Sequence, residues 1–271
     1  MNRQPVVTLG VSLKMYFSYQ RTLDWCRAIA AQLDAEPWVR SGHIQVFVIP
    51  SFPMLAAARE ILGSRARVGA QDVFWEDHGA YTGEVSPAVL RELGCDIAEI
   101  GHAERRRLFA ESEQQIAAKT HAAWRNGLTP VLCVGEAQHG LVPDTVALCL
   151  AQLDSALAQA RSAQLEGELI LAYEPQWAIG AAEPATPQYI GDVCQALREG
   201  VAERCGDSAR VIYGGSAGPG LLKRLGRRVD GLFLGRFAHE PAAFATILKE
   251  AAQLCASVQT PIEEGSQWQS A

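Results

Sequence analysis

The sequence predicts a single α/β domain folded as a (β/α)8 barrel. Short, apolar, β-branched runs alternate with longer segments of helical periodicity along the whole chain, without a break in composition. Such alternation is typical of a parallel sheet covered by helices. The length of 271 residues is also close to the roughly 250 residues usual for this barrel. We therefore expect residues 1–258 to form the barrel and the polar, aperiodic residues 259–271 to form a disordered tail.

Eight segments have the composition of strands that are buried on both faces. They are Val6–Val11, Ile44–Ile49, Arg67–Ala70, Ile97–Ile100, Pro130–Val134, Leu169–Tyr173, Arg210–Tyr213 and Gly231–Leu234. An open, doubly wound sheet is the alternative. A dinucleotide-binding sheet of that kind normally has a glycine-rich turn after its first strand, where this chain has Ser12-Leu13-Lys14. The count of eight strands favours the closed barrel.

The segments between these strands show the spacing of amphipathic helices. In the clearest one, Thr145–Ala163, one face is formed by Val146, Leu150, Leu153, Leu157 and Ala160. Similar helices are expected over Thr22–Leu33, Pro53–Leu62, Ser112–Asn126, Pro187–Cys205 and Pro241–Val258. Proline follows a capping-type residue at Ser86-Pro87, Thr186-Pro187 and Glu240-Pro241, which marks helix starts.

Composition excludes several classes of protein. The net charge is −6 and the only concentrated basic run is Arg105–Arg107, so the footprint of a nucleic-acid-binding protein is absent. The apolar runs are too short to span a membrane, and the N-terminus lacks the apolar core of a signal peptide. Seven scattered cysteines without a Cys-x-x-Cys pair argue against a disulfide framework or a zinc site. We expect a cytoplasmic protein with reduced thiols and without a metal or cofactor.

Ionisable side chains follow three of the expected strands. Lys14 comes after the first strand, His102 and Glu104 after the fourth, and Glu174 after the sixth. Each has a plain alternative, such as a solvated lysine, a loop histidine or a carboxylate that caps a helix. In a parallel barrel, however, the carboxyl ends of all strands meet at one mouth, where catalytic residues lie.

Together these groups fit proton abstraction beside the carbonyl of a phosphorylated sugar. A carboxylate can remove a carbon-bound proton, while an imidazole and an ammonium stabilise the oxyanion of the enediolate that forms. The last two strands end in Gly214-Gly215-Ser216 and Gly235-Arg236. Their backbone N–H groups can approach a phosphate closely.

At these residues the chain resembles the triosephosphate isomerases. The matching segments are Gly69–Gln71, Tyr81–Ser86, Gly101–Arg106, Cys133–Glu136, Ala172–Gly180 and Tyr213–Ser216. They occur in the family's order over about residues 6 to 255. The resemblance implies a TIM barrel that catalyses an aldose–ketose isomerisation.

The resemblance also implies roles for individual residues. Glu174 would be the base, His102 a neutral electrophile, Lys14 the electrostatic partner of the substrate oxygen and Glu104 the carboxylate that holds the lysine. Further substrate contacts would come from Ser12, Gly180, Ser216, Gly235 and Arg236. The segment Pro175–Thr186 resembles the family's closing lid. The family's homodimer would form through the loop Gln71–Ser86.

Four departures from the family pattern bear on the substrate. Ser12-Leu13 stands where the family has Asn-Trp, Ala103 where it has Ser, Ala181-Ala182-Glu183 where it has Thr-Gly-Lys, and Arg236 where it has a second glycine. The main expectation is triosephosphate isomerase itself, acting in glycolysis and gluconeogenesis. The alternative is a paralogue acting on a tetrulose phosphate, such as an erythrulose phosphate of tetritol catabolism, because those enzymes resemble this chain at the serine and at Gly-Arg.

Two further readings are less favoured. Schiff-base aldolases share the barrel, but their lysine typically follows the sixth strand, where this chain has Glu174. A catalytically inactive sugar-phosphate-binding barrel would be expected to lose the base or the histidine, and both are present here.

Overall fold

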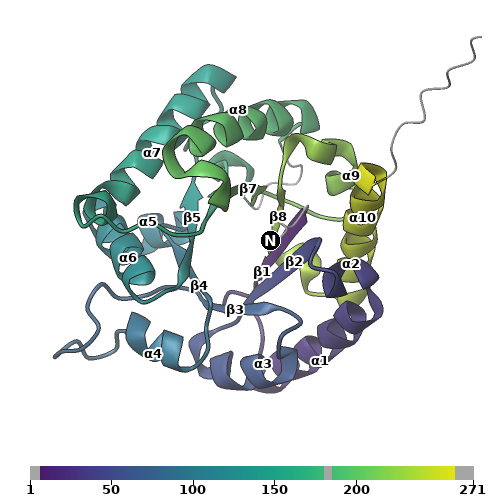
Figure 1. The fold of residues 1–271 in the computed structure, drawn as a ribbon, viewed down its shortest axis with the longest axis horizontal. Helices are drawn as coiled ribbons and strands as arrows, with labels where there is room; N and C mark the ends of the chain where they lie inside the picture. The colour runs from purple at the N-terminus through teal and green to yellow at the C-terminus, as the bar shows by residue number, and fades with distance from the viewer. Residues whose placement is uncertain (1–6, 180–184, 260–271) are drawn as a thin grey trace, which may run out of the picture.

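Eight parallel strands close into a barrel in sequence order in the computed structural model, which describes residues 7–179 and 185–259. β1 pairs with both β2 and β8, and helices surround the barrel (Figure 1). The predicted (β/α)8 fold is confirmed. The expected tail lies outside the described residues, except for Gln259 at the end of the last helix.

The strands agree with the expected ones to within one residue at each end. They are β1 (Val7–Ser12), β2 (Ile44–Ile49), β3 (Arg67–Ala70), β4 (Ile97–Ile100), β5 (Thr129–Val134), β6 (Leu169–Tyr173), β7 (Ala209–Tyr213) and β8 (Gly231–Leu234). Almost every residue in them is buried, because helices cover the outside of the barrel and side chains fill its inside.

Seven of the described helices follow an expected segment or, for α4, the expected helix start at Pro87. They are α1 (Tyr19–Ala35), α3 (Leu55–Leu62), α4 (Pro87–Glu92), α6 (Glu113–Arg125), α7 (Val142–Ser162), α8 (Pro187–Cys205) and α10 (Pro241–Gln259). Three short helices have too few turns to show a periodicity and were not expected. These are α2 (Pro37–Arg40), α5 (Ala103–Phe109) and α9 (Leu221–Leu225).

The buried face of α7 differs from the prediction. Val146 and Leu150 are only partly buried. The face that packs against the barrel consists of Thr145, Cys149, Leu153, Ala156, Leu157 and Ala160. The apolar residues of this helix form a wide stripe. Sequence spacing identified Leu153, Leu157 and Ala160 correctly, but at the start of the helix it chose Val146 and Leu150 over the buried Thr145 and Cys149.

Apolar side chains fill the barrel interior beneath the carboxyl ends of the strands. An inner apolar cluster contains Phe47 and Phe233, whose ring centroids are 5.6 Å apart. Gly10 makes room for this pair, since a Cβ atom there would lie 2.0 Å from Cζ of Phe47. Above this floor, the carboxyl ends of the strands leave space for polar side chains.

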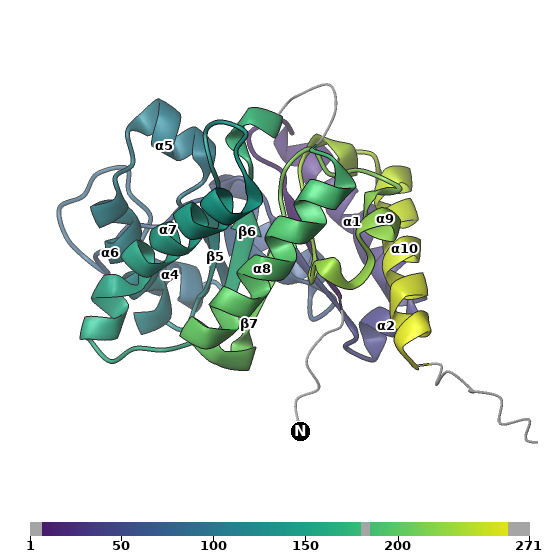
Figure 2. The same cartoon turned by 90° about the horizontal axis from the view of Figure 1, so that it is seen from above.

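The two ends of the barrel are distinct when it is viewed from the side. Figure 2 shows α5, which follows β4, at the end where the carboxyl ends of the strands lie, with α2 at the opposite end. No helix within the described ranges is long and apolar enough to cross a membrane. All seven cysteines are free thiols.

Candidate active site

A cavity of about 280 Å³ opens at the carboxyl ends of the strands. It brings together the expected site residues from five separate segments of the chain: Ser12, Lys14, His102, Glu104, Glu174, Ser216, Gly235 and Arg236. The remaining expected residue, Gly180, lies outside the described residues. Every expected site residue that the structure describes therefore lines this one cavity, and their roles remain a prediction.

Glu174 directly follows β6 and is 4% exposed. Its Oε2 atom has no hydrogen-bond partner in the described part of the chain, and it lies 3.4 Å from Nε2 of His102. Burial and the nearby charge of Glu99 raise the pKa of the Glu174 carboxyl to about 8, although a hydrogen bond with the Cys133 thiol opposes this. A buried carboxylate with a free oxygen is a strong proton acceptor once it is ionised.

Space for Glu174 depends on the glycine that follows β7. A Cβ atom on Gly214 would lie 2.7 Å from Cγ of Glu174 and 2.8 Å from its Oε1. Gly214 therefore sets the position of the carboxylate from the neighbouring strand, in addition to lining the cavity.

His102 is the N-cap of α5, and its Nδ1 accepts a hydrogen bond from the backbone N–H of Glu104 at 3.1 Å. In the neutral ring the proton is therefore on Nε2, which is the nitrogen nearer Glu174. Burial and the positive charge of Lys14 lower the pKa of His102 to about 4. At neutral pH the residue is thus an uncharged N–H donor that faces the cavity.

Lys14 combines an ion pair with an unusual backbone. Its Nζ lies 2.7 Å from Oε1 of Glu104, and this bond raises the pKa of the lysine despite the opposing effect of burial. Its φ of 48° is in the left-handed region that non-glycine residues rarely adopt. The Lys14 carbonyl accepts hydrogen bonds of 2.8 Å from both Ser51 and Gln71, which hold the backbone in place.

Glycine turns and two arginines also line the cavity. Ser216 donates a hydrogen bond of 2.8 Å to the carbonyl of Ala178, which links the turn after β7 to the segment after β6. The exposed Arg107 and Arg236 both line the cavity, and neither forms an ion pair with a described residue. Unpaired guanidinium groups and glycine turns around one cavity suit a phosphate.

Glu99 is a site residue that the sequence analysis missed. It lies within β4, is 3% exposed, and accepts a hydrogen bond of 2.9 Å from the hydroxyl of Ser12. Burial raises the pKa of its carboxyl to about 7. The signal was an acidic residue in an otherwise apolar strand, two positions after Ile97, which also faces the barrel interior.

A family model described as triosephosphate isomerase matches residues 7–251. The chain belongs to the triosephosphate isomerase family. It is 57% identical over 247 residues to an L-erythrulose-1-phosphate isomerase of Pectobacterium atrosepticum, covering 90% of this chain and 95% of that protein. It is 38% identical over 249 residues to an L-erythrulose-1-phosphate isomerase of Rhizobium etli (90% and 91%), and 38% identical over 221 residues to a triosephosphate isomerase of Solibacter usitatus (77% and 87%).

In this member of the triosephosphate isomerase family, Glu136 anchors the segment that follows Glu174. Its Oε1 accepts hydrogen bonds from Trp177 Nε1 at 2.7 Å, from the Tyr173 hydroxyl at 3.0 Å and from the Tyr189 hydroxyl at 3.4 Å. The tip of the expected lid, residues 180–184, lies outside the described residues. What the structure describes is thus the fixed base of that segment.

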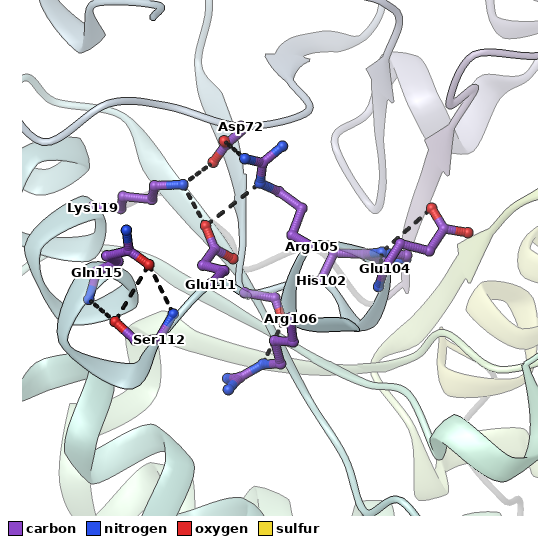
Figure 3. Close-up of polar contacts among 10 residues, drawn as sticks. Asp72, His102, Glu104, Arg105, Arg106, Glu111, Ser112, Gln115 and Lys119 are labelled. Atoms are coloured by element: carbon purple, nitrogen blue, oxygen red, sulfur yellow. Dashed lines mark hydrogen bonds and ion pairs between the residues drawn. The ribbon is translucent and has the colours of Figure 1, made fainter. Parts of the chain in front are cut away.

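A buried ionic cluster joins α5 to its neighbours (Figure 3). Lys119 pairs with Asp72 at 2.7 Å and also with Glu111, while Arg105 reaches Asp72 at 2.8 Å and Glu111 at 3.5 Å. Arg105 belongs to the helix that begins with His102 as its cap. The cluster therefore ties the cavity wall to α6 and to the loop after β3.

Proposed function

We propose that this protein isomerises a four-carbon ketose phosphate, with L-erythrulose 1-phosphate as its substrate. The main support is the 57% identity over nearly the full length of an L-erythrulose-1-phosphate isomerase, compared with 38% to a triosephosphate isomerase. The similarities favour this alternative over the triose phosphate that the sequence analysis placed first.

The isomerisation of this substrate gives a different kind of product from the isomerisation of a triose phosphate. L-Erythrulose 1-phosphate is dihydroxyacetone phosphate with an added hydroxymethyl group on C3. Its C1 carries the phosphate ester, so the carbonyl can move only from C2 to C3. A base removes the C3 proton, the C–H electrons form the C2=C3 bond of an enediolate, and the C2=O electrons move to O2. The proton of the C3 hydroxyl passes to O2, the O3 electrons form the new carbonyl, and a proton returns to C2. The product is erythrulose 4-phosphate, so the reaction interconverts two ketoses.

The residues of the cavity have suitable properties for these steps. Glu174 would remove the C3 proton and return it to C2, since one of its buried oxygens has no other partner within the described chain. The Nε2–H of His102 would donate to the two substrate oxygens in turn, and the ammonium of Lys14, held by Glu104, would stabilise the enediolate charge.

The phosphate would bind at the turns after β7 and β8. Backbone N–H groups around Ser216 and Gly235 and the guanidinium groups of Arg236 and Arg107 line the same cavity as the reactive groups. Gly180 and the rest of the lid segment would complete this contact when the lid closes, which remains part of the proposal.

We also propose that the protein works as a homodimer through residues 71–86. This loop, between β3 and α4, projects from the barrel (Figure 1). Gln71 at its base bonds to Lys14, and the neighbouring Met15 is 91% exposed, as an apolar side chain covered by a partner would be. Sedimentation equilibrium would test this, and a monomer at micromolar concentration would contradict it. A cytoplasmic location likewise remains a prediction.

Substrate identity can be tested directly with purified protein. We expect kcat/KM for L-erythrulose 1-phosphate to exceed that for dihydroxyacetone phosphate by at least about tenfold, because differential transition-state binding sets specificity. Phosphorus and carbon NMR would identify erythrulose 4-phosphate as the product, and deuterium from solvent should appear at its carbinol carbon. A kcat/KM for dihydroxyacetone phosphate equal to or greater than that for L-erythrulose 1-phosphate would refute the proposal.

A further inference from the structure

Glu99 has no part in the proton transfer proposed above, although it lies close to the groups that do. Its Oε1 is 4.0 Å from Nε2 of His102, and the hydrogen bond from Ser12 is the one that its carboxylate accepts within the described residues. A buried carboxylate without a bonded cation is costly. An apolar residue would fit better beside the inner cluster, so its presence calls for a reason.

The consequence of Glu99 for Ser12 is a fixed hydroxyl orientation. A serine hydroxyl has one proton and two lone pairs. When Glu99 is ionised it can only accept, so the Ser12 proton is directed at Oε2 of Glu99. Ser12 lines the cavity, and its oxygen therefore faces a ligand as an acceptor alone.

An acceptor at this position distinguishes among the oxygens of the proposed substrate. The oxygens on C2 and C3 change between carbonyl, enediolate and hydroxyl, and they need donors such as His102 and Lys14. The oxygen on C4 remains a hydroxyl throughout the reaction and can donate at every stage. Triose phosphates have no equivalent of this group.

We propose that Glu99, acting through Ser12, forms the subsite for the C4 hydroxyl and is a specificity-determining positioning residue of this enzyme. This inference rests on the proposed function, since it concerns the group by which a tetrulose phosphate exceeds a triose phosphate. The pair comes from β1 and β4, which are three strands apart around the barrel, so the bond crosses the barrel interior and depends on the curvature of the sheet.

The test is a cycle of two substrates and several variants. The substrates are L-erythrulose 1-phosphate and its 4-deoxy analogue, which keeps the fourth carbon but lacks the hydroxyl. Assays at pH 8.5 keep Glu99 ionised. We expect the wild-type protein to prefer the hydroxylated substrate by at least about tenfold in kcat/KM, mainly through KM, because a buried acceptor left unpaired is costly.

The variants should separate the two residues from a general loss of structure. In Ser12→Ala and in Glu99→Leu, the preference should fall to within about threefold of unity. Glu99→Gln should retain most of it, since the amide oxygen can still accept the Ser12 proton. Thr8→Val is the matched control, because it removes a buried hydroxyl from the same strand outside the cavity lining, and it should keep the full preference.

The outcomes separate this inference from the proposed function. A wild-type protein without activity on L-erythrulose 1-phosphate would refute both. An active wild type whose tenfold preference persists in Ser12→Ala would refute the hydroxyl subsite alone. If Glu99→Leu fails to fold, Ser12→Ala and Glu99→Gln still decide the matter, since loss of the preference in the first and retention in the second support the inference.

Discussion

The free Oε2 atom of Glu174 lies 3.4 Å from Nε2 of His102, yet the two residues do not form an ion pair at neutral pH. Their surroundings move their pKa values in opposite directions, because the carboxyl of Glu174 rises to about 8 and the imidazole of His102 falls to about 4. Both shifts arise mainly from burial, which disfavours whichever form is charged. At neutral pH both groups are therefore largely uncharged, and Glu174 becomes a base beside the neutral N–H donor of His102 as the pH rises through 8.

The first prediction concerns the base. Glu174→Gln keeps the shape of the side chain and removes its ability to accept a proton, so kcat should fall by at least about 10³-fold. Circular dichroism and the melting temperature should show an intact barrel. Glu203→Gln, at a side chain that is 78% exposed, serves as the control. Retention of a tenth of wild-type turnover in Glu174→Gln would rule out this role.

The second prediction concerns pH and stability. The folded-state pKa of Glu99 is about 7, above its ordinary value of 4.5, so the native state binds more protons than the unfolded state between these values. Its favourable contribution is complete below pH 4.5 and is lost as the pH rises through 7. The glutamine in Glu99→Gln does not titrate. The free energy of unfolding of this variant, relative to that of the wild type, should therefore increase by about 1–3 kcal/mol from pH 5 to pH 9.

Urea unfolding at pH 5, 7 and 9 would measure this difference. Glu113→Gln, at a partly exposed carboxylate on α6, should show no comparable trend. A gap between Glu99→Gln and wild type that stays constant over this range would mean that Glu99 is ionised at all three pH values.

The third prediction concerns a glycine. Gly214→Ala places a methyl group within 2.8 Å of the Glu174 carboxylate and should displace it, so kcat should fall by about 10–100-fold with a smaller change in KM. Gly140→Ala is the matched control, since its Cβ would meet its nearest neighbour, Thr145, at an ordinary 3.7 Å. Steady-state kinetics of the two variants would check this, and equal kcat values would contradict it.

The fourth prediction concerns the ionic cluster of Asp72, Arg105, Glu111 and Lys119. Lys119→Met leaves Asp72 and Glu111 buried with Arg105 as their remaining partner, and should lower the free energy of unfolding by about 3–5 kcal/mol. Arg161→Met breaks a much more exposed pair with Asp154 and should cost less than about 1 kcal/mol. Urea denaturation would compare them. A small effect of Lys119→Met would show that Arg105 alone compensates both carboxylates.

The strand positions could be predicted because strands buried on both faces are continuous apolar runs. The site was predictable where a polar residue follows such a run, as Lys14, His102 and Glu174 do. Glu99 was missed because it lies inside its strand, where the inward direction is known only from the register. Its bond to Ser12 joins residues 87 positions apart and depends on the curvature of the sheet.

The run Arg105–Arg107 shows a second limit of the sequence. The three arginines are adjacent in the sequence and look like one basic stretch. In a helix, however, successive side chains point about 100° apart. Arg105 enters the buried cluster, Arg106 bonds to Gly101 at 2.8 Å and pairs with Glu113, and Arg107 lines the cavity. Only the short helix α5, which periodicity did not predict, assigns these three directions.

The backbone of Lys14 has a consequence for engineering. A left-handed conformation costs a lysine roughly 1 kcal/mol that glycine would not incur. The ion pair of Lys14 with Glu104 acts against this cost, so the strained backbone is retained where it holds the ammonium in the cavity. A glycine at this position would relieve the backbone strain but remove the charge that the proposed reaction uses, so a change in stability at Lys14 has to be read together with activity.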